Sequence, residues 1–254
     1  MFDVLSAYQD IEPNPQPEAI STKEDKAMTK TTPKRVQQNP QLVIHYDNNY
    51  EEYPVTTGHG PLIGNYLGRL KETIEKARSF NEETFVTRFD LHFPLTYHEN
   101  AAENDNRILT AFWDCLNHQT DLSLLDYGRY IRYAWARELG EDNRPCYRIL
   151  LMISAKSVSD IRDRLVTSTA TDNLVDLRTC IAIAWSVTLG CSPADSINAV
   201  HFLYDPSTND FFQKVINRHD EESWQQLFKD VSHICKKATK PFGQNLHTFE
   251  CSIY

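Results

Sequence analysis

Four residues near the C-terminus have the types and spacing of a site that handles phosphate. His233 is followed by Lys236 three residues later and by Lys240 seven residues later, with Lys237 beside them. Offsets of three and seven place side chains on one face of a helix. Lysines neutralise phosphate charge. The cluster therefore predicts a nucleic-acid contact, although lysines also suit the end of a solvated helix.

A second polar group lies on the strand predicted for residues 84–93. Apolar and polar residues alternate there, so Arg88, Asp90 and His92 share one face, while phenylalanines and a leucine occupy the other. Pro94 ends the strand. Such a trio predicts a site, and it is also compatible with the solvated face of an antiparallel sheet.

The elements that must position these residues alternate between helices and strands. Helical periodicity marks residues 61–80, 107–119, 158–166, 174–189 and a last helix from about 221; strand-like runs occupy 84–93, 130–138, 146–153 and 198–204. The short turn over 140–145 indicates an antiparallel pair of strands. This mixed order predicts the α+β class, with an antiparallel sheet flanked by helices.

Composition limits the classes of function. The chain has 254 residues, of which 41% are hydrophobic, and a net charge of −9. Nucleic-acid binders are usually basic, so a DNA contact here requires a local basic patch. Six scattered cysteines without a Cys-x-x-Cys pair argue against a zinc knuckle and favour a cytoplasmic location. No run of about 18 apolar residues occurs, so we expect no membrane partner.

The chain is expected to divide into two parts. Residues 1–57 place several prolines among polar side chains, and such a sequence buries too little surface to offset its chain entropy. We therefore expect a largely disordered tail over 1–57 and one domain over 58–254.

Seven motifs follow one another in a fixed order within the predicted domain. They are Arg88-Phe-Asp-Leu-His-Phe-Pro94, Tyr133-Ala-Trp-Ala-Arg-Glu138, Cys146-Tyr-Arg-Ile-Leu-Leu, Ala184-Trp-Ser, Val200-His-Phe202, Ser232-His-Ile-Cys-Lys-Lys-Ala-Thr-Lys-Pro-Phe-Gly243 and Phe249-Glu-Cys-Ser252. Together they resemble the inovirus gene II-like, or YagK/YfjJ C-terminal domain, family, which looks like a branch of the rolling-circle replication initiators. The resemblance implies the HUH replication-initiator (RRM-like) fold. In that fold two histidines on a central strand hold a divalent metal, and a tyrosine on a later helix attacks the scissile phosphate.

Carried onto this sequence, the resemblance places the metal pair at Cys146 and Arg148 and the tyrosine at His233. Mg²⁺ and Mn²⁺ prefer oxygen and imidazole ligands, whereas an arginine has no lone pair to donate and repels a cation. We therefore expect the metal site to be lost and no cofactor to be bound. Mg or Mn would be required only by a nickase that had rebuilt its centre.

Three further residues stand where the resemblance places polar groups facing the site: Asp90, His92 and Glu138. In one interpretation Asp90 pairs with Arg88 or Arg148, so that an ion pair fills the metal position. In the other, the residues retain a role in binding, with His92 as a remaining ligand. The candidate DNA contacts are Lys236, Lys237, Lys240, Arg88 and Arg148.

These observations favour a prophage- or mobile-element-encoded relative of a rolling-circle initiator whose catalytic motifs have degenerated. We expect a DNA-binding or regulatory protein and not an enzyme, with single-stranded or origin DNA and phage or host proteins as partners. Two alternatives stay open. One is an active single-strand DNA nickase rebuilt around His233, Cys146 and His92, and the other is an acidic protein-interaction module that binds no DNA.

Overall fold

A six-stranded antiparallel sheet forms the centre of the protein. The computed structural model describes residues 33–94, 97, 106–120, 131–140, 143–160, 177–192, 198–205, 208–243 and 246–252. The strand order is β12 (Gln213–Asn217), β6 (Glu83–His92), β8 (Pro145–Ser154), β7 (Arg132–Leu139) and β13 (Phe249–Cys251), and β9 (Val200–Phe202) pairs with β6 on the same side as β12. Every pairing in this sheet is antiparallel.

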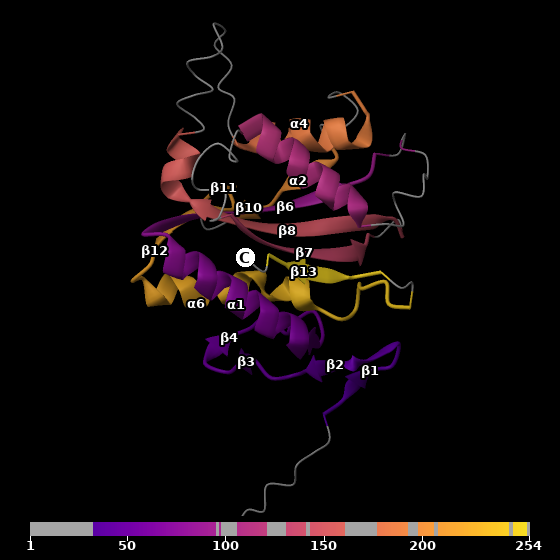
Figure 1. Cartoon of the computed structure of the whole chain (residues 1–254). Helices are drawn as coiled ribbons and strands as arrows, with labels where there is room; N and C mark the ends of the chain where they lie inside the picture. The colour runs from indigo at the N-terminus through magenta and orange to yellow at the C-terminus, as the bar shows by residue number, and fades with distance from the viewer. Residues whose placement is uncertain are drawn as a thin grey trace, which may run out of the picture. The chain divides into compact units, whose positions relative to one another are not determined.

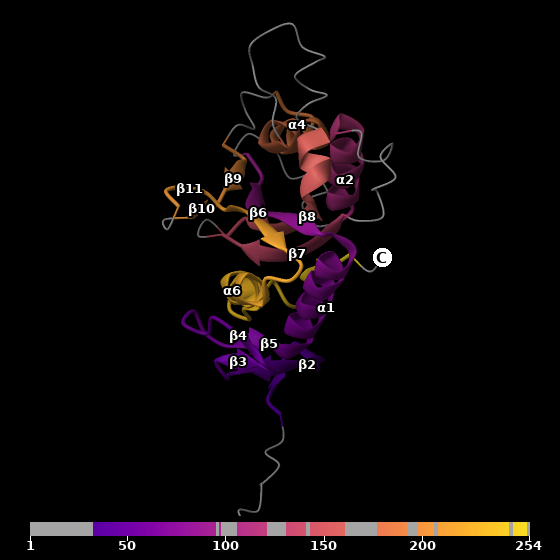
Figure 2. The same ribbon diagram turned by 90° about the vertical axis from the view of Figure 1, so that its left-hand side faces the viewer.

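Helices cover both faces of the sheet (Figures 1 and 2). One face packs against α2 (Arg107–Thr120) and α4 (Leu177–Leu189), and the other against α1 (Gly64–Phe80) and α6 (Glu221–Val231). The α+β class with a helix-flanked antiparallel sheet is thus confirmed. The two faces enclose two separate hydrophobic clusters, one on each side of the sheet.

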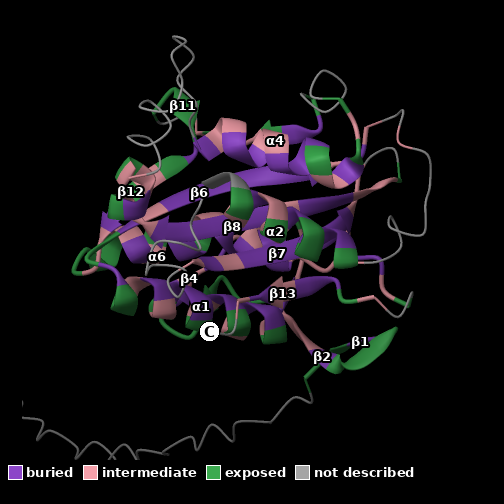
Figure 3. Cartoon of the chain, turned by 45° about the horizontal axis from the view of Figure 1, so that its top comes forward, coloured by how far each residue is buried: buried purple, intermediate pink, exposed green. Residues whose placement is uncertain are grey.

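Residue periodicity explains these elements. In α1, Leu67, Leu70 and Ile74 recur at three- and four-residue intervals and are buried. Figure 3 shows that β6, β8 and β7 are largely buried while the helices keep exposed outer faces. At the start of α6 the Asp220 side chain accepts a hydrogen bond from the Ser223 backbone N–H, which caps the helix.

The structured domain begins earlier in the chain than the sequence indicated. The compact unit starts at Pro33, and residues 33–57 form β1 (Arg35–Val36), β2 (Asn39–His45), β3 (Asn49–Tyr50) and β4 (Tyr53–Pro54). Val36, Tyr53 and Val55 are buried in the cluster that also holds α1 and α6. A strand β5 (Leu62–Ile63) pairs with β2, so this segment continues into the domain. Residues 1–32 lie outside the described residues.

The last helix is shorter than expected. It ends at Val231 and is followed by a 3₁₀ turn, η2 (Ser232–Cys235), after which Lys236 has extended backbone angles. His233, Lys236 and Lys240 therefore do not share one face of a helix, and that expectation is wrong. Their side chains converge through the turn, as described below.

The remaining expected elements fall partly outside the described residues. The end of the helix expected at 158–166 and the start of the one at 174–189 are among them, and Gly190, with φ of 64°, follows the end of α4. The strand expected at 198–204 is divided between β9 and β10 (Tyr204–Asp205), and β10 pairs with β11 (Asp210–Phe211). No helix among the described residues combines the length and apolarity needed to cross a membrane.

Candidate functional site

The register of the central strands brings polar residues together on one face of the sheet. Asp90 of β6 lies opposite Arg148 of β8, and Arg148 lies opposite Ala136 of β7, two residues from Glu138. Because side chains alternate along a strand, Asp90, Arg148 and Glu138 all point to the face that α6 covers. These three residues form the centre of the candidate site.

Arg148 bridges two carboxylates. Its Nη1 lies 2.6 Å from Oδ2 of Asp90, and its Nε lies 2.7 Å from Oε2 of Glu138. These are charge-assisted hydrogen bonds of strong geometry. The guanidinium therefore stands between the two acids, in the position that the resemblance assigns to a metal ligand. Of the two pairings considered from sequence, the structure contains the one with Arg148.

Glu138 is the most heavily engaged residue of the site. Only 1% of its side chain is exposed, and it also binds Lys240 Nζ at 2.8 Å and Lys236 Nζ at 3.3 Å. Lys240 donates a further hydrogen bond to the Ile234 carbonyl at 2.8 Å. Burial by itself raises the pKa of Glu138, but Lys240 and Arg148 outweigh it and lower the pKa to about 2. Glu138 is therefore ionised and holds three cations.

His233 uses both ring nitrogens for hydrogen bonds within the site. Nδ1 lies 2.8 Å from the Asp230 carbonyl, and Nε2 lies 2.7 Å from Nη2 of Arg88. A carbonyl only accepts and a guanidinium only donates, so Nδ1 carries the proton and the Nε2 lone pair is taken by Arg88. Burial and then the charge of Arg88 lower the pKa of His233 to about 3. The ring is neutral, yet the lone pair that would attack phosphorus is engaged.

The pKa of His233 predicts a pH-dependent stability. Since a free histidine titrates near 6.5 and this ring near 3, the unfolded chain binds a proton that the folded chain does not. The stability that depends on a neutral His233 ring is therefore fully present above pH 6.5, and it is lost as the pH falls towards 3. The free energy of unfolding, measured by urea titration, should fall between about pH 7 and 5, by at most about 1.4 kcal/mol per pH unit for one proton.

A glutamine control isolates this effect. His233→Gln keeps an acceptor for Arg88 and a donor for the Asp230 carbonyl but cannot titrate, so its slope with pH should be smaller than that of the wild type. His219→Gln, at an exposed position, should keep the wild-type slope. Equal slopes in all three proteins would show that His233 does not titrate as described.

The site contains more positive than negative charge. Arg88, although buried enough to lower its pKa to about 10, remains charged at neutral pH. Four cations (Arg88, Arg148, Lys236 and Lys240) face two carboxylates (Asp90 and Glu138), which is a formal excess of +2. Nearby, Lys214 pairs with Asp230 and Asp205, and including these three leaves an excess of +1. A local positive site therefore exists within an acidic chain.

The donor set does not fit the divalent metal that the resemblance implies. Arg148 offers no lone pair and is bonded to both carboxylates. Cys146 is buried, and burial raises the pKa of its thiol to about 11, so the sulfur is protonated at neutral pH. No group of three or more His, Cys, Asp or Glu residues in the described part of the chain is arranged to hold a metal.

His92 belongs to the edge of the site. It lies opposite Cys146 in the register of β6 and β8, and its ring packs against that of His201 with 4.4 Å between the centroids. His201 of β9 is itself opposite Asp90. Sequence reasoning missed His201 as a site residue, although it lies in the quoted Val200-His-Phe202 motif. Lys214 and Asp230 were also missed, since neither lies at a position that the resemblance marks.

The five expected DNA contacts are not equally accessible. The Lys240 side chain is fully buried, and Arg88 is buried and hydrogen-bonded to His233. Arg148 retains 28% and Lys236 17% of their side-chain exposure, and Lys237 is half-buried. Lys240 and Arg88 therefore have no surface position from which to contact DNA, which corrects the expectation for these two. Arg148, Lys236 and Lys237 remain as candidates.

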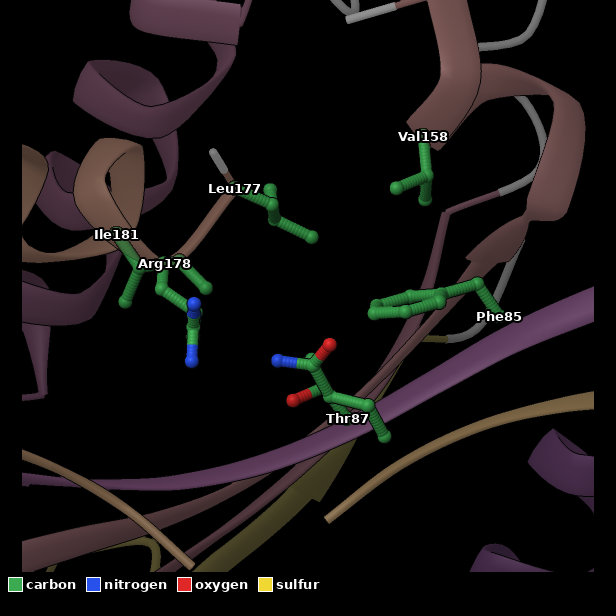
Figure 4. Close-up of a pocket in the computed structure, with 7 residues that line it drawn as sticks. Phe85, Thr87, Val158, Leu177, Arg178 and Ile181 are labelled. Carbon is green, nitrogen blue, oxygen red and sulfur yellow. The ribbon is translucent and has the colours of Figure 1, made fainter. Parts of the chain in front are cut away.

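A small cavity lies on the opposite face of the sheet (Figure 4). Phe85 and Thr87 of β6 line it together with Leu177, Arg178 and Ile181 of α4, and its volume is about 70 Å³. Phe85 and Thr87 point away from the face that carries Asp90. The cavity is thus separate from the polar site and has room for only a few atoms.

Comparison with family models gives a match over residues 45–252 to the YagK/YfjJ C-terminal domain. The chain belongs to the YagK/YfjJ C-terminal domain family. The family match spans every residue of the polar site and all six strands of the central sheet, whereas β1 and most of β2 precede it. A search of curated proteins and a search of solved structures returned no match.

Proposed function

We propose that this member of the YagK/YfjJ C-terminal domain family is a non-cutting relative of the rolling-circle replication initiators, encoded by a prophage or another mobile element. In this proposal it binds the phosphate backbone of single-stranded DNA and acts in the cytoplasm, where its six free cysteines are compatible with a reducing environment. The observation that carries the proposal is the guanidinium of Arg148 between Asp90 and Glu138.

Loss of cutting follows from two features of the site. A nickase needs a nucleophile with an available lone pair and an electrophilic group on the scissile phosphate. The lone pair of His233 accepts from Arg88, and the Cys146 and Arg148 positions cannot chelate Mg²⁺ or Mn²⁺. In the rebuilt-nickase alternative, His233 would have to lose its hydrogen bond to Arg88, and Arg148 would have to leave Asp90 and Glu138.

Phosphate binding is supported by the excess positive charge. Asp90 and Glu138 leave part of the charge of Arg148 and Lys236 uncompensated, and both side chains are partly exposed. Lys237 follows directly, with its backbone N–H held by the Pro61 carbonyl at 3.0 Å. A strand of DNA can approach these three cations while the rest of the acidic surface disfavours general binding.

Fluorescence anisotropy with a labelled single-stranded oligonucleotide tests the proposal. Affinity should fall steeply between about 50 and 200 mM salt, because binding releases counterions. Lys236→Gln should weaken binding and reduce the salt slope by about one unit. Lys229→Gln removes the same charge from an exposed position on α6 and should bind as the wild type does.

The alternatives give different results in the same experiment. Absence of binding at low salt would favour an acidic protein-interaction module. A covalent protein–DNA adduct on a denaturing gel, formed with Mn²⁺ present, would establish the nickase and overturn the proposal.

A further inference from the structure

A polar groove of about 390 Å³ shares no lining residue with the ion-pair cluster of Asp90, Glu138, Arg148, Lys236 and Lys240. Its walls come from the start of β2 and the residues before it, from α1, and from the C-terminal segment before and at the start of β13. Three exposed amide side chains, of Gln38, Asn39 and Gln41, form one wall. The groove is of the size that small-molecule sites in proteins usually have, about 300–1,000 Å³.

Three buried residues that line the groove pack closely on one another. Tyr66 of α1 stacks on Phe249 of β13 with 4.5 Å between the ring centroids, and its hydroxyl is 2.7 Å from Oγ1 of Thr248. All three residues are buried. A ligand would therefore meet a preformed surface, which reduces the entropy lost on binding.

The charge in the groove is positive. Arg69 of α1 is exposed, and its guanidinium forms no ion pair or hydrogen bond with any residue in the described ranges. The described residues that line the groove include no aspartate or glutamate, although the chain carries 35 acidic residues. The groove is therefore suited to an anionic or neutral polar ligand, and Arg69 is the group that would hold the anion.

The lining also includes an aromatic side chain, that of Phe242. Phe242 is half-buried and packs against the hydrophobic cluster below it. Its backbone N–H bonds to the Lys240 carbonyl at 2.9 Å, which fixes the position of the chain beside the groove. A flat ring held in this way can stack on a nucleobase, and base stacking tolerates any base.

We propose that this groove binds a nucleotide, with its base against Phe242, its base edge on the amides of Gln38 and Gln41, and its phosphate on Arg69. Amide side chains offer both donors and acceptors, as base edges do. The side chains of Gln38 and Gln41 form no hydrogen bond with another described residue, so they are available to a ligand.

This inference goes beyond the proposed function. The groove combines residues of the matched domain, Arg69 and Phe242 among them, with the segment from Gln38 to Leu42, which precedes the family match at residue 45. It adjoins the ion-pair cluster through one segment, since Lys240 is anchored in the cluster and Phe242 lies two residues later. The nucleotide is therefore either a free molecule or one unit of a single strand.

Isothermal titration with the four ribonucleoside 5′-monophosphates, and with a 12-residue mixed-sequence DNA oligonucleotide, tests the inference. Arg69→Gln should weaken binding about tenfold or more, because a charged hydrogen bond to phosphate is lost. Phe242→Leu keeps an apolar side chain but removes the flat ring, and should weaken binding to a similar extent. Lys229→Gln, which removes an exposed lysine on α6 outside the groove, should bind as the wild type does.

The results separate the two sources of the nucleotide. If a monophosphate binds and Arg69→Gln weakens it, the ligand is a free nucleotide. If only the oligonucleotide binds, with losses in Arg69→Gln and Phe242→Leu that persist in a Lys236→Gln background, the groove holds one unit of a strand. Absence of binding for every probe at millimolar concentration, or affinities unchanged by both groove variants, would overturn the inference. If DNA does not bind at the ion-pair cluster, the proposed function fails, but binding of a monophosphate in the groove would still support this inference.

Discussion

Glu138→Gln is expected to lower the free energy of unfolding by about 3–5 kcal/mol, the range for removing one partner of a buried ion pair. Glutamine has nearly the same shape but no charge, so Lys240, whose side chain is fully buried, would lose its counter-ion. Arg148 would keep only Asp90. Urea unfolding followed by tryptophan fluorescence measures the loss, and an unchanged m-value shows that the folded state is still compact.

Two further variants show whether the loss comes from uncompensated charge. Glu83→Gln, at an exposed position in β6, should change stability by less than about 0.5 kcal/mol. Lys240→Met removes the buried cation, and the double variant with Glu138→Gln should be more stable than the sum of the single losses predicts, because neither charge is left alone. A cost below about 1 kcal/mol for Glu138→Gln would contradict the role given to this residue.

His233→Tyr by itself is expected to produce no cleavage of single-stranded DNA. The tyrosine would supply the nucleophile that the proposed relationship to the replication initiators implies, but Arg148 would still stand between Asp90 and Glu138. An arginine cannot chelate a metal, so the phosphate would lack its electrophilic partner. A denaturing gel with labelled oligonucleotide and Mn²⁺ would detect a covalent adduct. The expected result is no adduct above background.

A triple variant tests which substitutions are needed together for DNA cleavage. His233→Tyr together with Cys146→His and Arg148→His supplies the nucleophile and both imidazole ligands that the proposed function assigns to a cutting relative, and only this combination is expected to form an adduct. The double variant Cys146→His/Arg148→His is the matched control, since it has the ligands without the tyrosine. Adduct formation by His233→Tyr alone would show that Arg148 does not prevent metal-assisted cutting, which would contradict the proposal.

The sequence predicted the central strands because their alternation has a period of two. Residues 84–93 and 146–153 correspond closely to β6 and β8, and the side-chain alternation placed Arg88, Asp90 and His92 on one face. The bond between Asp90 and Arg148 was one of two interpretations that the sequence allowed, and only the register of β6 and β8 decides it.

Other parts of the site depend on tertiary structure that no short pattern records. Lysine is rarely buried, so the enclosure of Lys240 by Glu138 could not be expected from its type. The spacing of His233, Lys236 and Lys240 indicated a helix, but the chain forms a 3₁₀ turn at Ser232–Cys235. The turn still brings Lys236 and Lys240 to Glu138. Residues 33–57 have the polar composition of a tail, yet four buried apolar side chains among them pack into the core: Val36, Leu42, Tyr53 and Val55.

Manganese anomalous diffraction from crystals of the wild-type protein soaked in Mn²⁺ tests the central claim most directly. We expect Arg148 to remain between Asp90 and Glu138, with no manganese peak among Asp90, His92, Cys146 and His233. A manganese peak among these residues, with the guanidinium of Arg148 turned away from both carboxylates, would contradict the account.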